Sequence, residues 1–195
     1  MSNLKQCAAL FVLISKYPVM IKKISIVMAL FSALCMPFAQ AQSGTLADNS
    51  TITYRVKSLA GPVNGSVSGL KGKITFDPPN LQNSSIDISV DPATIKSGLS
   101  LRDKDLKNET VWFDVAKYPA GTFKSTSVTK TATGYLADGT LTLKGKDHKI
   151  QVAFTNSNDT YTGSFKINRL DYSIGKPSGL VKDEVEITFN IIVKK

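Results

Sequence analysis

The chain has 195 residues, which is enough for one large domain or two small ones. Lys and Arg outnumber Asp and Glu by 24 to 15, giving a formal net charge of +9. The excess is spread along the chain and forms no basic block interleaved with aromatic residues, which argues against nucleic acid as a partner and leaves a transient contact with a membrane surface open.

Residues 1–41 differ from the remainder of the chain because they contain no Asp or Glu. From Met20, a short basic region precedes an apolar run over residues 24–38 and a small-x-small sequence at residues 39–41. This order is typical of a secretory signal peptide, and we predict cleavage after Ala41. Because Met20 would be a natural start for such a peptide, Met1 and Met20 both remain open as the first residue.

We therefore predict a leader over residues 1–41, with its cleavable signal peptide at 20–41, and a single domain over 42–195 that is periplasmic or secreted. Loss of the leader's four lysines lowers the net charge from +9 to +5. Both cysteines, Cys7 and Cys35, lie in the leader, so the mature domain can form no disulfide and must be stabilised by its core.

The mature sequence alternates apolar with polar residues in short runs, which is typical of half-buried antiparallel strands. The first run, residues 51–57, places Ile52, Tyr54 and Val56 on one face. Gly and Pro at residues 61–65 predict a turn or a broken strand. Further strands of the same kind are predicted at residues 69–76, 85–90, 121–128, 134–137, 140–143, 149–154, 161–167 and 184–193.

Two short segments between these runs are predicted as turns. Asp138-Gly139 is a hairpin signal because glycine tolerates positive φ. His148, the sole histidine, lies in a turn-like stretch over residues 146–149, where it is predicted to be a surface side chain. Eight or nine strands with short connections predict an all-β domain, either a closed barrel or a sandwich, and the alternation fits both.

One long segment, residues 100–119, interrupts the strand pattern. Ser100 and Asp103 have the spacing of a capping box, so a short helix is predicted to start there. Arg102 then lies either in a surface ion pair or opposite a phosphate or carboxylate head group, which its planar fork would bind. Further on, Arg169 and Asp171 share one strand face and could pair with each other or with this segment.

The sequence shows no phosphate-binding loop, no nucleophile elbow and no metal-spaced group of Cys and His. We therefore predict no catalytic residues, no metal site and no cofactor. Chemistry on a head group through Asp103, Asp105 or His148 is the weakest of the hypotheses, because no nucleophile and base form a pair.

Seven sequence motifs follow one another along the mature chain, at residues 67–78, 85–91 with 94–95, 102–103 with 106–107, 112–114 with 117–119, 123–125, 139–145 and 168–172. In order and spacing they resemble the YceI-like (polyisoprenoid-binding) family. The resemblance implies an extended antiparallel, lipocalin-like β-barrel of about eight strands with one short helix-containing insertion. It also implies an exported binding protein, not an enzyme, that holds an isoprenoid or another long-chain lipid.

The resemblance makes the apolar strand faces candidates for the cavity lining, with an ordinary packed core as the alternative. We expect ligand contacts from Phe76, Ile88, Phe123, Leu141, Leu143, Phe154, Phe165, Ile167, Ile187 and Phe189, from Trp112 and Phe113 at the mouth or floor, and from Arg102 and Arg169. The alternative function is a β-sandwich interaction or adhesion module without a small ligand. The sequence leaves open whether the protein is a monomer or a homodimer.

Overall fold

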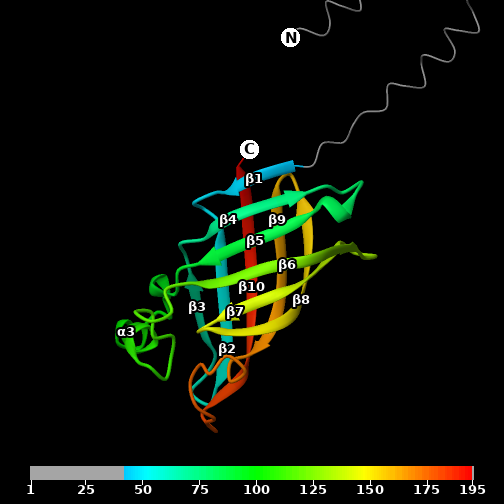
Figure 1. Ribbon diagram of the computed structural model, residues 1–195. Helices are drawn as coiled ribbons and strands as arrows, with labels where there is room; N and C mark the ends of the chain where they lie inside the picture. Colours follow the sequence, from blue (N-terminus) through cyan, green and yellow to red (C-terminus); the bar gives the residue numbers. More distant parts are fainter. Residues whose placement is uncertain (1–41, 195) are drawn as a thin grey trace, which may run out of the picture. The chain divides into compact units, whose positions relative to one another are not determined.

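The computed structural model describes residues 42–194; the predicted leader and its cleavage site lie outside the described residues. The described chain forms ten β-strands and a single α-helix (Figure 1). The strands are β1 (Gln42–Leu46), β2 (Thr51–Ser58), β3 (Val63–Val67), β4 (Lys71–Phe76), β5 (Ser85–Val90), β6 (Gly121–Lys130), β7 (Tyr135–Leu143), β8 (Lys146–Ser157), β9 (Thr160–Asn168) and β10 (Val181–Lys194). The helix is α3 (Ser100–Asn108), and two 3-10 helices, η3 (Leu81–Asn83) and η4 (Pro92–Thr94), lie beside β5.

Eight of the strands close into an antiparallel barrel. The order is β1-β4-β5-β6-β7-β8-β9-β10, and β1 returns to pair with β10. The closing contacts join Thr45 to Lys194 and Leu46 to Val193. The structure therefore confirms the barrel that the family resemblance implied and excludes the sandwich.

The long strand β10 has three neighbours because β1 and β2 lie end to end along one of its edges. Ser50 bridges the break between them: its Oγ accepts a hydrogen bond from Ile192 N at 3.0 Å and lies 3.2 Å from Ile192 O. The side chain is buried, with 6% of its surface exposed. One serine thus replaces the strand pairing that the break removes.

The hairpin of β2 and β3 continues the wall to the segment that follows β5. Ser66 and Lys96 exchange two backbone hydrogen bonds, of 2.8 and 2.9 Å, and Thr94 Oγ1 accepts one from Ser68 N at 2.9 Å. Gly65 permits this close approach, because a Cβ there would lie 2.3 Å from both Lys96 O and the Tyr54 ring. Four residues therefore complete the wall where no full strand pairing exists.

The buried side chains form two clusters inside the barrel. The larger contains an aromatic group in which Phe76 meets Tyr135 edge to face at 4.8 Å and Tyr161 at 5.6 Å. The smaller is centred on Leu141, Tyr172 and Ile174. Residues of both clusters, such as Phe154 and Leu141, line the site described next.

Three local predictions were wrong in their details. The two predicted strands at 134–137 and 140–143 are the single strand β7 (Tyr135–Leu143), and Asp138-Gly139 lies within it, near a bulge in β6 between Ser125 and Ser127. The actual turn is Lys144-Gly145, where both residues have positive φ, 48° and 70°. His148 consequently lies in β8 and is half-buried, instead of standing in a surface turn.

Candidate functional site: an apolar cavity in the barrel

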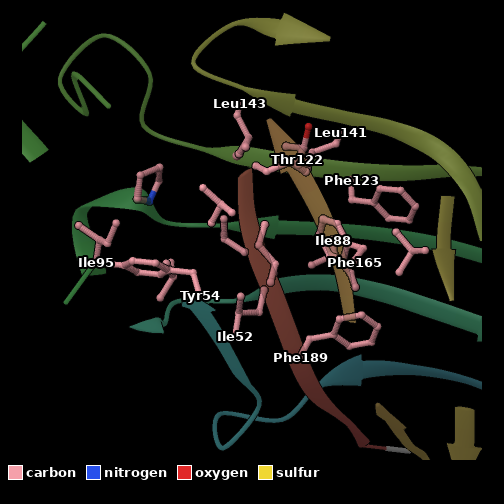
Figure 2. A pocket seen from close by; sticks show the side chains of 18 of the residues that line it. Ile52, Tyr54, Ile88, Ile95, Thr122, Phe123, Leu141, Leu143, Phe165 and Phe189 are labelled. Carbon is pink, nitrogen blue, oxygen red and sulfur yellow. The ribbon is translucent and has the colours of Figure 1, made fainter. Parts of the chain in front are cut away.

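A cavity of about 240 Å³ runs through the interior of the barrel. Side chains from β2, β5, β7, β9 and β10 project into it (Figure 2). Apart from Tyr54, Thr122, Tyr161 and Arg169, every side chain of the lining is a hydrocarbon. A site of this composition can accept apolar groups but offers few hydrogen bonds to a polar ligand.

The lining follows directly from the period of two in the strands. On β10, Val185, Ile187, Phe189 and Ile191 all face the cavity, while Glu186 and Thr188 between them are exposed. Antiparallel pairing then brings inward residues of neighbouring strands together, as where Ile187 lies opposite Phe165 of β9. The alternation in the sequence thus becomes one continuous apolar surface.

Most of the predicted ligand-binding residues line this cavity. They are Ile88, Phe113, Phe123, Leu141, Leu143, Phe154, Phe165, Ile167, Arg169, Ile187 and Phe189. Phe76, Arg102 and Trp112 lie outside the lining. Contact of any of these residues with a ligand stays a prediction.

Several lining residues were absent from the predicted set. Ile52, Tyr54 and Val56 of β2 face the cavity, and their alternation could have identified them. Ile95 and Leu106 also line it, but they lie outside strands. No periodic signal in the sequence could have placed that second pair.

Trp112 and Phe113 are adjacent in sequence but have different surroundings. Phe113 N donates to Leu106 O at 3.0 Å, and both of these residues line the cavity. Trp112 packs against Gly175, where a Cβ would lie 2.7 Å from the indole ring. Phe113 is therefore part of the site, whereas Trp112 holds the segment after α3 against the loop that precedes β10.

Arg169 lines the cavity and is buried, with 4% of its surface exposed, and it connects several chain segments at one end of the barrel. Its Nε donates to Lys182 O at 3.2 Å, Nη1 to Ile174 O at 2.9 Å and Nη2 to Lys176 O at 3.0 Å. Nη2 also donates to Asp183 Oδ1 at 2.7 Å, so the ion-pair partner is Asp183 and not Asp171. The guanidinium thus fixes the loop that caps the barrel.

Arg102 and Asp103 fix the chain that enters α3. Arg102 Nε donates to Ser97 Oγ at 2.8 Å and Nη2 to Ser97 O at 2.8 Å, while Asp103 Oδ1 accepts from Ser97 N at 2.7 Å. The predicted capping box is absent: the residue at the N-cap is Leu99, without a side-chain hydrogen bond. The hydrogen bond from the Ser97 hydroxyl holds the pKa of Asp103 below its usual value. This hydrogen bond therefore stabilises the fold at neutral pH, and its contribution is lost as the pH falls through the lowered pKa of Asp103.

We expect Arg102→Ala to lower the free energy of unfolding by about 1–2 kcal/mol, because two hydrogen bonds to buried Ser97 are lost. Urea denaturation measures the change. Lys104→Ala is the matched control, since Lys104 is exposed on the same helix. Equal stability of the two variants would contradict a structural role for Arg102.

The cavity is almost uncharged at physiological pH. Burial raises the pKa of Tyr54 and of Tyr161 to about 12, so both hydroxyls stay neutral. Among the residues that line the cavity, Arg169 has the single charged side chain.

Within residues 42–194, no group of three His, Cys, Asp or Glu side chains could hold a metal ion. No helix in the same range is long and apolar enough to cross a membrane.

Comparison with known proteins places this architecture in a family. The model of the YceI-like domain matches residues 45–193, more than half of the chain. A UPF0312 protein of Yersinia pestis (strain Pestoides F) is 28% identical over 151 residues, covering 72% of this chain and 78% of the relative.

Two solved structures share the fold. The crystal structure of Burkholderia cenocepacia BcnA has a TM-score of 0.68 at 27% identity and covers 74% of this chain and 96% of the other. A domain from Saccharophagus degradans, described as polyisoprenoid-binding and implicated in plant cell wall breakdown, has a TM-score of 0.55 at 14% identity. It covers 78% of this chain and 97% of the other, and at this identity it supports the fold alone.

Proposed function

Because this chain belongs to the YceI-like family, we propose that it is a binding protein that holds the apolar tail of a long-chain lipid in its barrel. The observation that carries the proposal is the hydrocarbon lining of the 240 Å³ cavity. A single water needs about 10–15 Å³ of such volume and several polar partners, so this space suits an apolar chain better than water. The function we propose is binding without catalysis.

Tail length sets the affinity in this proposal. Each methylene-sized unit that enters the cavity contributes roughly 0.8 kcal/mol, so a longer tail binds more tightly until the cavity is full. A charged head group has little reason to enter, because burial of an ion without a partner costs several kcal/mol. The donors of Arg169 are engaged by the loop before β10 and by Lys182 and Asp183 at the start of β10, which leaves the head group outside.

We propose an isoprenoid or a fatty-acid-like lipid as the ligand. The name of the Saccharophagus degradans domain supports an isoprenoid, while the chemistry of the lining supports any flexible hydrocarbon tail. We further propose, from the predicted leader at residues 1–41, that binding takes place in the periplasm or outside the cell.

Native mass spectrometry of the purified protein tests the proposal. We expect one lipid per chain, released by extraction into organic solvent and restored by adding a long-chain isoprenoid or fatty acid. Restoration should raise the midpoint of thermal unfolding, because the lipid binds the folded state alone. A protein that carries no lipid and gains no thermal stability from either class would instead support an interaction module without a small ligand.

A further inference from the structure

Two exposed leucines lie side by side at one end of the barrel. Leu59 follows the end of β2 and Leu180 precedes the start of β10, and Leu59 N donates to Leu180 O at 2.9 Å. Their side chains are 77% and 66% exposed. Among the described residues, the exposed large hydrophobic side chains are these two and the pair Leu99 and Leu101. Adjacent exposed apolar groups of this size mark a surface that a partner can cover.

Cationic side chains surround the Leu59–Leu180 pair. Lys57, Lys176 and Lys182 are exposed on the two segments that carry the leucines. No Asp or Glu occurs at residues 57–63 or 172–182. The next acidic residues along, Asp183 and Glu184, are ion-paired with Arg169 at 2.7 Å and with Lys166 at 2.8 Å, and Glu184 also interacts with Lys57. Lysines outnumber acidic residues around the leucines, so this surface carries a net positive charge.

The other exposed pair has charges of both signs beside it. Leu99 and Leu101 lie at the start of α3, which carries Asp103 and Asp105 but also three Lys or Arg side chains. The pKa of Asp103 is lowered by its hydrogen bond from Ser97, so its carboxylate is charged at neutral pH. These two carboxylates offset most of the attraction that an anionic partner would find beside α3, whereas residues 57–63 and 172–182 around Leu59 and Leu180 contain no acidic residue.

The cationic leucine pair adjoins the end of the cavity. Val56 and Val185 both line the cavity and lie opposite each other on β2 and β10. Leu59 is three residues beyond Val56, which corresponds to about 10 Å along an extended chain. The loop fixed by Arg169 lies at that end of β2 and β10 (Figure 1), and its residue Ile174 lines the cavity. A partner on this surface would stand within a few residues of the cavity lining.

We propose that Leu59 and Leu180 form a docking site for an anionic lipid surface. The leucines insert among the acyl chains while Lys57, Lys176 and Lys182 lie at the level of the anionic head groups, as in other proteins that bind membrane interfaces. Docking places the end of the cavity next to the membrane, where a lipid tail can pass between the two. That transfer rests on the proposed function, whereas docking itself does not.

Flotation with vesicles tests the docking site. We expect the protein, produced from its full sequence, to bind vesicles of phosphatidylglycerol and phosphatidylcholine and to bind phosphatidylcholine alone far more weakly. Leu59→Asn with Leu180→Asn should lower the bound-to-free ratio by at least about ten-fold, because two leucines no longer enter the apolar layer. Leu99→Asn with Leu101→Asn is the matched control and should change the ratio by less than about two-fold.

A second pair of changes, Lys176→Glu with Lys182→Glu, keeps the leucines and reverses the charge. We expect a similar loss on anionic vesicles and a weaker dependence on salt. An equal loss from both leucine pairs, or no loss from Leu59 and Leu180, would overturn the assignment. Thermal unfolding checks that each variant is folded, and the exposure of all four leucines makes folding of these variants the expected result.

Lipid uptake in vesicle-free solution separates this proposal from the proposed function. The Leu59 and Leu180 variant should take up a tail in solution as the unchanged protein does, because neither leucine lines the cavity. If the unchanged protein binds vesicles yet takes up no tail, the proposed function fails and the docking site stands. If it takes up a tail but ignores anionic vesicles, the docking site fails alone.

Discussion

Replacement of both Val56 and Ile187 by phenylalanine is expected to lower the affinity for a long-chain lipid by about 100-fold while the barrel stays folded. Both residues line the cavity from neighbouring strands and are only half-buried, so larger side chains have room to enter it. Two aromatic rings would displace roughly four methylene units of a tail, which at about 0.8 kcal/mol each amounts to about 3 kcal/mol, or a factor of about 100.

Titration of a delipidated protein with a fluorescent long-chain lipid measures this effect. Thr53→Phe with Thr188→Phe is the matched control, because these two residues are paired on the same two strands and face outward. The control adds the same aromatic bulk outside the barrel and should leave the affinity within about two-fold. Unchanged affinity in the Val56 and Ile187 variant would place the lipid elsewhere on the protein.

Arg169→Met is expected to lower the free energy of unfolding by about 3–5 kcal/mol, the largest stability effect we expect of a single polar substitution here. Methionine fills much of the same volume but donates no hydrogen bond. The carbonyls of Ile174, Lys176 and Lys182 would lose their donor, and Asp183 its ion-pair partner. The loop that caps the barrel would then lose the contacts that fix it.

Urea denaturation measures this loss in stability, and two substitutions with smaller expected effects serve as comparisons. Asp183→Asn removes the ion pair but leaves the guanidinium bound to its carbonyls, so we expect about 1 kcal/mol. Lys166→Ala breaks the pair with Glu184, in which both side chains are more than half exposed, so we expect the smallest loss of the three. If Arg169→Met costs no more than Lys166→Ala, the loop has another source of order.

The alternation of apolar residues predicted much of the fold and of the cavity lining, because both depend on the same period of two. The runs that became β5, β9 and β10 carry strong patterns, and their inward residues Ile88, Phe165 and Ile187 face the cavity as expected. Periodicity gives the face of a strand but not its neighbours. The distinction between barrel and sandwich therefore came from the family resemblance and not from the pattern.

The missed features depend on contacts between distant parts of the chain. Strand β1 has only a weak pattern, and pairing with β4 and β10 is what makes it a strand. Two of the partners of Arg169, Ile174 and Lys176, lie on an irregular loop, which no repeat in the sequence describes. In the same way, Asp103 bonds to Ser97 before the helix instead of capping it, a choice that local spacing did not reveal.

The position of β10 in the barrel has a consequence for how the protein folds. This strand is the last in the described chain, yet β9, β2 and β1 all pair with it, and Ser50 reaches Ile192 across 142 positions of sequence. The ring can therefore close only after the C-terminal strand has docked. Because such distant contacts carry a large entropic cost, we expect folding in milliseconds to seconds. Until the last step, the sheet keeps an unpaired edge that is prone to aggregation.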